Sequence, residues 1–309
     1  MKVFRQISAF TSPCRPVVTV GVFDGVHKGH LEIINRLSTV AKEKNCESVV
    51  ITFEPHPRLV LPHHAELKLL QTLDEKLERF EIAGVDSVLV IPFDREFARI
   101  TPHDFIKKVL VDQVGISHVI TGYDHFFGQN RQGGFELLSE MGMQYNFTVD
   151  ELQMVTVGSS TVSSSSVRRA LLDGDVKHAS SMLGYIYSIS GEVVVGNKIG
   201  RNIGFPTANL KSSNSHKLVP GQGVYASIVN SNGVNYKGMA NIGYRPTIDA
   251  DRLTIEVHIF DFNQDIYGQD ITLCFVERIR SEKRFGSLGD LQLQLANDKI
   301  VAGRMLEGF

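Results

Sequence analysis

The first half of the chain alternates short apolar runs with longer segments whose apolar residues recur at helical spacing. The runs are rich in Val and Ile and predict buried strands at residues 17–22, 48–53, 87–93 and 117–122. The helical segments cover residues 30–44, 72–84 and 101–113, with a shorter one at 163–174. Because strand and helix alternate, we expect a parallel sheet covered by helices on both faces, with ligands at the carboxyl ends of the strands.

Two of the predicted helices carry explicit start signals. Thr72 and Glu75 form a capping box, and Gly84 follows that helix as a stop signal. Thr101 is expected to cap the next helix, because Pro102 then occupies the first helical position, where its missing N–H costs nothing. The sequence therefore predicts where both helices begin.

The hydrophobic pattern changes near residue 183. Short β-rich runs replace the helical spacing, at residues 187–196, 223–230, 234–243, 253–262 and 270–280. Ser-Asn-Gly at 231–233 is typical of a hairpin turn, and residues 288–306 predict a final helix. We expect a small antiparallel β-barrel with a C-terminal helix, and two domains covering residues 1–183 and 184–309.

Composition supports an ordinary globular protein and excludes several classes. The chain has 309 residues and a formal net charge of −2, which gives no electrostatic case for nucleic acid or membrane binding. The longest apolar runs, such as 87–93, are too short to cross a bilayer, and the N-terminus lacks the apolar core of a signal peptide. Cys14, Cys46 and Cys274 form no Cys-x-x-Cys motif, which favours a reduced, cytoplasmic setting over a disulfide framework.

The stretch GVFDGVHKGH, residues 21–30, directly follows the first predicted strand. A strand that passes through a glycine turn into a helix builds a phosphate site, because the helix N-terminus presents free N–H groups and a positive dipole end. Gly25 and Gly29 remove side chains that would block a ligand, and His27 and His30 can present both imidazoles on one helical face. This arrangement suits nucleotidyl transfer, which depends on positioning and charge stabilisation.

The same histidine pair also admits a zinc interpretation. Zinc needs a third or fourth ligand, and none stands at suitable spacing, although folding can recruit His63 or His64. A surface pair without function is the remaining alternative.

A second glycine-rich stretch, GNKIGRNIGFPTANL, covers residues 196–210. Thr207 and Asn209 are two residues apart, so an extended segment directs both side chains to one face. A hydroxyl and an amide oxygen are hard, neutral ligands, which suit Mg²⁺ that arrives with ATP phosphates. The alternative is a loop with a polar tip, which is common for segments of this composition.

The run LTIEVHIFDF, residues 253–262, alternates as a strand with one aliphatic face. Glu256 lies on the other face, together with Thr254 and His258. Such a carboxylate can take a proton from a substrate hydroxyl. From this stretch alone, a solvent-facing strand residue is the simpler interpretation.

Several stretches of the first half resemble one enzyme family. GVFDGVHKGH is similar to the His-x-Gly-His signature of nucleotidyltransferases, in the form found in the adenylyltransferase module of bacterial riboflavin kinase/FMN adenylyltransferases, also called FAD synthetases. FEPHP (53–57), GYDHFFGQNRQG (122–133) and VSSSSVR (162–168) resemble further segments of that module. The resemblance implies a Rossmann-like domain and ATP-binding roles for Gly21, Phe23, Asp24, Gly25, His27, Gly29, His30, Ser164, Ser165 and Arg168. It implies flavin-binding roles for Pro55, Pro57 and Asp124, with His27 and His30 as the catalytic pair.

The second half resembles the riboflavin kinase module of the same family. GRNIGFPTAN (200–209), GVYA (223–226), NIGYRPT (241–247) and EVHIFDFNQDIYG (256–268) follow in the family's order. The resemblance implies that Glu256 is the general base and that Thr207 and Asn209 hold the Mg²⁺ of ATP. It also implies ATP- or flavin-binding roles for Gly196, Gly200, Arg201, Gly204, Pro206, Thr207 and Asn209. The expected ligands are ATP, riboflavin, FMN and FAD, without nucleic acid or membrane.

The first module departs from the family pattern at some positions. Phe126 stands where the family usually has Arg, with Arg131 as a nearby substitute cation, and Ser165 replaces Thr. Three alternatives therefore remain beside the bifunctional enzyme. They are a riboflavin kinase with a degenerate or differently specific nucleotidyltransferase module, a flavin carrier without turnover, and a tRNA-linked enzyme. The triphosphate-site residues disfavour the carrier, and the absence of a Lys/Arg-rich patch disfavours the tRNA-linked enzyme.

Overall fold

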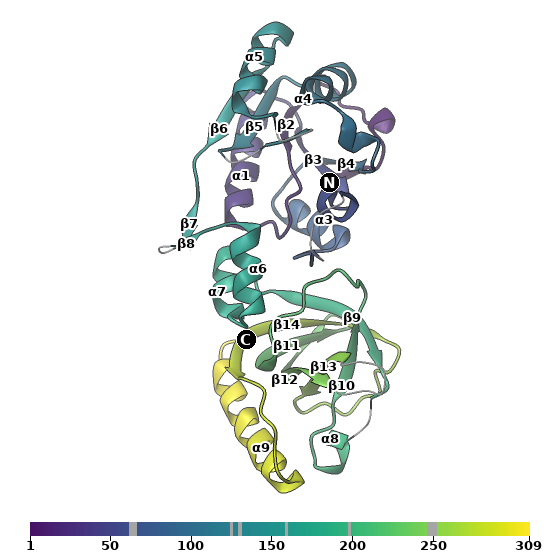
Figure 1. Cartoon of the computed structure of the whole chain (residues 1–309), viewed down its shortest axis with the longest axis vertical. Helices are drawn as coiled ribbons and strands as arrows, with labels where there is room; N and C mark the ends of the chain where they lie inside the picture. The colour runs from purple at the N-terminus through teal and green to yellow at the C-terminus, as the bar shows by residue number, and fades with distance from the viewer. Residues whose placement is uncertain (62–66, 124–125, 129–131, 158–159, 197–198, 246–251) are drawn as a thin grey trace. The chain divides into compact units, whose positions relative to one another are not determined.

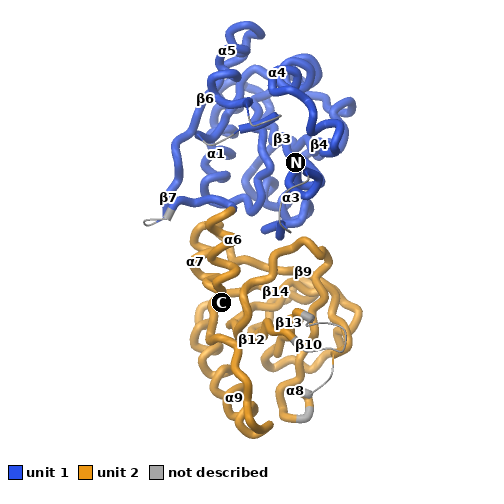
Figure 2. The backbone as a smooth tube through the Cα atoms, viewed as in Figure 1, with its two compact units in different colours: residues 1–164 blue, residues 165–309 orange. Residues whose placement is uncertain are grey.

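A computed structural model describes the chain except for residues 62–66, 124–125, 129–131, 158–159, 197–198 and 246–251 (Figure 1). Its contacts divide it into two compact units, Met1–Ser164 and Ser165–Phe309 (Figure 2). This division lies ahead of residue 183, because helices α6 (Ser164–Leu172) and α7 (Val176–Leu183) group with the second unit, where α7 packs against strand β14 (Asp270–Arg280).

The first unit is built on a six-stranded parallel sheet in the order β1-β4-β3-β2-β5-β6. Its strands are β1 (Lys2–Phe4), β2 (Val17–Val20), β3 (Ser48–Glu54), β4 (Ser87–Pro92), β5 (His118–Gly122) and β6 (Thr148–Leu152). The four central strands confirm the four predicted runs. The edge strands β1 and β6 were not predicted, because neither contains a fully buried residue and neither has a continuous apolar run.

Helices cover both faces of this sheet, as the alternating pattern predicted. The α-helices of this unit are α1 (Lys28–Glu43), α2 (Pro57–Val60), α3 (Leu73–Ile82), α4 (Pro102–Asp104) and α5 (Phe135–Tyr145), with short 3₁₀ turns at Ile7–Ala9 and Phe97–Arg99. The capping box on α3 and the Thr101 cap on α4 are confirmed. After α4 the chain continues as a π-helix, η3 (Phe105–Val114), rather than as the expected α-helix.

Two hydrophobic cores lie on opposite faces of the sheet, because successive strand residues point to opposite sides. One core joins Val17, Val50 and Val88 to α1 and to Phe80 of α3. The other joins alternate strand residues, such as Val18, to η3 and α5. A small hairpin of β7 (Thr156–Val157) and β8 (Ser160–Thr161) precedes α6.

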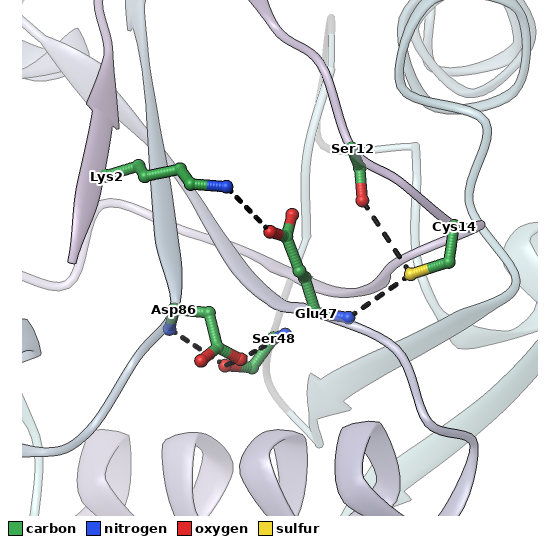
Figure 3. Close-up of polar contacts among 6 residues, drawn as sticks. All are labelled: Lys2, Ser12, Cys14, Glu47, Ser48 and Asp86. Atoms are coloured by element: carbon green, nitrogen blue, oxygen red, sulfur yellow. Dashed lines mark hydrogen bonds and ion pairs between the residues drawn. The ribbon is translucent and has the colours of Figure 1, made fainter.

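The amino ends of the central strands are tied together by polar contacts (Figure 3). The Asp86 carboxylate accepts hydrogen bonds from the amide and hydroxyl of Ser48, at 2.9 and 2.7 Å. Nearby, the Lys2 ammonium lies 3.1 Å from the Glu47 carboxylate, and the Glu47 amide donates to the sulfur of Cys14 at 3.4 Å. These contacts stabilise the sheet at the amino ends of its strands. They do not involve the carboxyl ends, where a ligand is expected.

The second unit is a closed antiparallel barrel in the order β10-β13-β12-β11-β14-β9, which confirms the predicted barrel. Its elements are β9 (Ser188–Val194), α8 (Ile199–Asn202), β10 (Ala208–Ser212), β11 (Gly223–Ser231), β12 (Val234–Arg245), β13 (Arg252–Ile259), β14 and α9 (Leu288–Met305). Asn232 and Gly233 both have positive φ, at 51° and 80°, so the predicted hairpin turn has the primed form that suits twisted strands.

The predicted C-terminal helix is α9, which packs against β11, β12 and β14. Arg280 on β14 donates to the carboxylate of Asp298 on α9 at 3.1, 3.0 and 2.8 Å, and that carboxylate is buried. A paired buried charge of this kind holds the helix on the barrel.

Candidate active sites

The first candidate site is the loop from Gly21 to His27, at the carboxyl end of β2. The order of the strands reverses between β2 and β5, which is where open α/β sheets bind ligands. Three loop residues, Phe23, Gly25 and Val26, have positive φ angles of 52°, 90° and 32°. The chain turns sharply here, and α1 begins directly afterwards with His27 as its N-cap.

The two predicted histidines form a stacked pair at the start of α1. Their ring centroids lie 3.6 Å apart with 17° between the planes. The amide of His30 donates to Nδ1 of His27 at 3.3 Å, which leaves Nε2 to carry the proton of a neutral His27 ring. The prediction that one helical turn brings both imidazoles together is therefore confirmed.

Gly29 permits this stack. A Cβ at position 29 would lie 3.2 Å from Nδ1 of His27 and 3.3 Å from its Cε1. That spacing is tighter than ordinary contact, so a side chain at position 29 would require the His27 ring to shift by a few tenths of an ångström. The glycine between the histidines therefore serves ring placement as well as ligand access.

Phe23 and Asp24 have structural contacts that the sequence did not reveal. The Phe23 ring meets Phe80 and His30 edge-on, at centroid distances of 5.6 and 5.1 Å. The Asp24 carboxylate, 3% exposed, accepts hydrogen bonds from the amides of Leu70, at 3.0 and 3.2 Å, and of Gln71, at 3.2 Å. Both residues thus fasten the loop to α3 and to the segment before it, while their ATP-binding roles stay predictions.

Ser164 reaches the same loop from the far end of the first unit. Its hydroxyl donates to the carbonyl of Asp24 at 2.8 Å, which joins two segments 140 residues apart. Ser165 and Arg168 follow on α6, in the second unit, and their phosphate-binding roles remain predictions.

The predicted flavin-binding prolines lie at the carboxyl end of β3. Pro55 follows Glu54 through a cis peptide bond, and Pro57 opens α2, with His56 as the N-cap. Asp124, the third predicted flavin contact, lies outside the described residues, as do His63, His64 and Arg131. Phe126 is 50% exposed.

The second candidate site brings three predicted residues together on the barrel. The Thr207 hydroxyl donates to Oε2 of Glu256 at 3.3 Å. Asn209 on β10 stands directly opposite Glu256 on β13 in the antiparallel register. Residues opposite each other in such a pair project to the same face, so all three side chains share one surface.

Asn241 on β12 belongs to the same surface and was not predicted. It stands opposite Glu256 on the other side of β13, so Glu256 is flanked by asparagines on both neighbouring strands. Nothing in the sequence signals this, because strand register depends on turns and packing far from the residues concerned.

The glycines of the second stretch allow close approach of the chain. A Cβ on Gly196 would collide with the carboxamide of Asn209, and one on Gly200 would collide with the carbonyl of Phe205. Gly204 has a φ of 81°. A cleft of about 490 Å³ lies alongside, lined among others by Arg201, Thr207 and residues 262–267. Its volume falls within the usual range of small-molecule sites.

His258 contacts the Pro-Thr-Ala-Asn segment, residues 206–209, through the carbonyl of Pro206. Its side chain is 7% exposed, and its Nδ1 lies 2.8 Å from the carbonyl of Pro206, so the neutral ring donates through Nδ1–H. Burial lowers the pKa of His258 below its usual value of 6.5, although the Pro206 carbonyl and Asp261 oppose this and Lys299 assists it. The folded chain therefore holds a neutral ring at this position.

Acid is expected to destabilise the folded protein through His258. Its pKa is lowered on folding, so the unfolded chain binds the proton more readily, and stability present above pH 6.5 is lost as the pH falls below that value. His118, whose pKa burial also lowers, acts in the same direction. We expect His258→Asn, which keeps a donor for Pro206, to lose fewer degrees of melting temperature between pH 7 and pH 5.5 than the parent. Equal losses measured by thermal unfolding would contradict this role.

Comparison with known proteins identifies the family. A family model described as FAD synthetase matches residues 10–166, and one described as riboflavin kinase matches residues 183–306. The bifunctional riboflavin kinase/FMN adenylyltransferase of Escherichia coli strain K12 is 40% identical over 93% of this chain and 91% of its own length. The chain belongs to the bifunctional riboflavin kinase/FMN adenylyltransferase family. It is a transferase that combines both domains, as the sequence resemblance implied.

A second bacterial protein and a solved structure are also similar to this chain. The Bacillus subtilis strain 168 protein of the same name is 37% identical over 94% of this chain and 92% of its own length. A crystal structure described as a macrolide-efflux protein from Streptococcus pneumoniae superposes with a TM-score of 0.88 at 31% identity, covering 97% of both chains. The description as an efflux protein concerns the Streptococcus protein alone. Among the described residues of this chain, no helix has the length and apolar character needed to cross a membrane.

The structure bears on the alternative of a zinc site at His27 and His30. The described residues contain no group of three or more His, Cys, Asp and Glu side chains placed to hold a metal ion. The zinc alternative for His27 and His30 therefore has no third ligand within the described part of the first unit. The oxygen donors of Thr207 and Asn209 are the candidates for metal binding in this bifunctional enzyme.

Proposed function

We propose that the chain converts riboflavin to FAD in two ATP-consuming steps at two separate sites. The barrel transfers the γ-phosphoryl group of ATP to riboflavin and forms FMN. The α/β unit then transfers the adenylyl group of a second ATP to FMN and releases pyrophosphate. The observation that carries the kinase step is the convergence of Thr207, Asn209 and Glu256 on one surface of the barrel.

In the kinase step, Glu256 takes the proton of the ribityl 5′-hydroxyl as that oxygen attacks the γ-phosphorus. The hydrogen bond from Thr207 orients the carboxylate, and the flanking Asn241 belongs to the same surface. Thr207 and Asn209 suit Mg²⁺, because they offer neutral hard oxygens and Gly196 leaves Asn209 room beside the loop. When bound with ATP, that ion neutralises charge on the phosphates. The cleft beside Thr207 takes a ring system of one substrate.

In the adenylyl step, a phosphate oxygen of FMN attacks the α-phosphorus of ATP and pyrophosphate leaves. The N–H groups at the start of α1 bind the phosphates, and His27 and His30 stabilise the charge that grows on them. Ser164, Ser165 and Arg168 bind the departing phosphates, and Pro55, Pro57 and Asp124 contact the flavin. The reaction requires no covalent intermediate on the protein.

The deciding experiment is a product analysis with pure protein, riboflavin, ATP and MgCl₂. Chromatography is expected to show FMN first and FAD later. FMN without FAD would support the alternative of a degenerate or differently specific nucleotidyltransferase module, which the departure at Phe126 motivates. No conversion at all would contradict the proposal. The cytoplasmic setting expected from the cysteines stays part of this proposal.

A further inference from the structure

Lys76 is a buried lysine beneath the histidine loop. It lies near the start of α3, where the positive end of the helix dipole disfavours a cation. Its position falls on the apolar stripe of Leu73, Leu77 and Phe80, whose members pack in the core under the sheet. The side chain is only 4% exposed, which is rare for lysine unless it is paired.

Lys76 is hydrogen-bonded to the loop of the first site. Its ammonium donates to the carbonyl of Val22 at 2.8 Å, a bond across 54 residues of sequence. Burial lowers the pKa of Lys76, while the carboxylates of Asp24 and Glu54 oppose that shift. The lysine therefore lies between the loop that carries the histidines and the end of β3, which leads to the predicted flavin-binding prolines.

The loop needs such support because its backbone is strained. Phe23 and Val26 are not glycines, yet both have positive φ, and this conformation is least favourable for a β-branched residue such as Val26. Each such residue costs about 1–3 kcal/mol and persists only where its surroundings hold it in place. Besides Lys76, the hydroxyl of Thr52 donates to the same Val22 carbonyl at 3.2 Å.

We propose that Lys76 is a positioning residue of the adenylyl transfer. It holds the strained loop in the conformation that presents the first amides of α1 and the stacked imidazoles to the phosphates. Being buried, it acts through the loop and does not touch ATP. This inference rests on the proposed adenylyltransferase function.

The test replaces Lys76 by methionine, which matches its length and removes the charge and the donor. Removing one member of a buried charge pair costs stability. The Asp24 carboxylate keeps its hydrogen bonds from the amides of Leu70 and Gln71, so the unit is expected to remain folded, with a lower melting temperature. We expect kcat for FAD formation from FMN to fall by about 10- to 100-fold, because small displacements of positioned groups have effects of this size. The KM for FMN is expected to stay within about two-fold, since the flavin contacts are not part of the loop.

Two readouts and one control variant separate positioning from a merely structural role. Hydrogen exchange is expected to accelerate in peptides covering residues 21–31 and to stay unchanged in β3 and β4. Riboflavin phosphorylation is expected to match the parent. Lys42→Met, an exposed lysine in the last turn of α1, is the matched control and should change none of these quantities.

Several outcomes would overturn the proposal. The first is FAD formation by Lys76→Met at the rate of the parent. The second is a lower melting temperature or faster hydrogen exchange throughout the first unit, with no greater acceleration of exchange in residues 21–31 than elsewhere. If Lys76→Met does not fold, Lys76→Gln, which keeps a donor, takes its place under the same criteria, with a smaller loss expected. If the parent protein forms no FAD, the proposed adenylyltransferase function is wrong. Hydrogen exchange in residues 21–31 of Lys76→Met would still test whether Lys76 stabilises the loop.

Discussion

Glu256→Gln is expected to lower FMN formation from riboflavin by about 100- to 10,000-fold, the usual contribution of a general base. Glutamine keeps the shape of the side chain and an acceptor for the Thr207 hydroxyl, so the surface of the barrel should stay intact. Because the adenylyl step uses a different site, conversion of added FMN to FAD should stay within about two-fold of the parent. Chromatography of the flavins from both reactions measures the two effects side by side.

A matched control for this variant is Glu192→Gln, an exposed glutamate on β9 of the same barrel. It should leave both reactions unchanged. If Glu256→Gln still phosphorylates riboflavin at the rate of the parent, Glu256 is not the base. If it loses both reactions together, the two sites are not separate.

His30→Ala is expected to have the opposite selectivity. Removing one donor that stabilises developing charge commonly lowers a rate by about 100- to 1,000-fold. The change also removes one ring of the stack with His27, whose centroid lies 3.6 Å away. FAD formation should therefore fall to this extent, while FMN formation from riboflavin continues at the rate of the parent.

The control for the second variant is His103→Ala, an exposed histidine on α4 of the same unit. Mixing the two deficient proteins adds a further check. His30→Ala supplies FMN, and Glu256→Gln converts it, so the mixture should form FAD from riboflavin much faster than either protein does alone. Failure of the mixture, with each remaining single activity confirmed, would contradict two sites that exchange free FMN.

The positions of the elements were largely predictable because hydrophobic spacing is a local property. The central strands, the capping box at Thr72 and the hairpin turn at 231–233 all lie where the pattern placed them. The edge strands were missed because neither contains a fully buried residue, so neither shows a continuous apolar run. The π-helix after Asp104 was missed because its residues have ordinary helical composition, and side-chain spacing does not distinguish π from α hydrogen bonding.

Some candidate site residues could be predicted from one short segment of sequence, and others could not. Motifs within one segment, such as the histidine pair and the Thr207–Asn209 pair, were visible in the sequence. Lys76 and Asn241 were not, because each acts through a contact with a segment far along the chain. The sequence shows only that Lys76 occupies a core position of an amphipathic helix. It does not show that the side chain binds the carbonyl of Val22.

The sequence by itself determined the two kinds of fold, the order of the central strands and main helices, and the two glycine-rich motifs, because periodicity, capping and glycine placement act over a few residues. Only the tertiary structure decided that Asn209, Glu256 and Asn241 stand side by side, and that Lys76 and Asp24 fasten the histidine loop. Strand register and buried long-range contacts are set by the packing of the whole unit, which no short stretch of sequence contains.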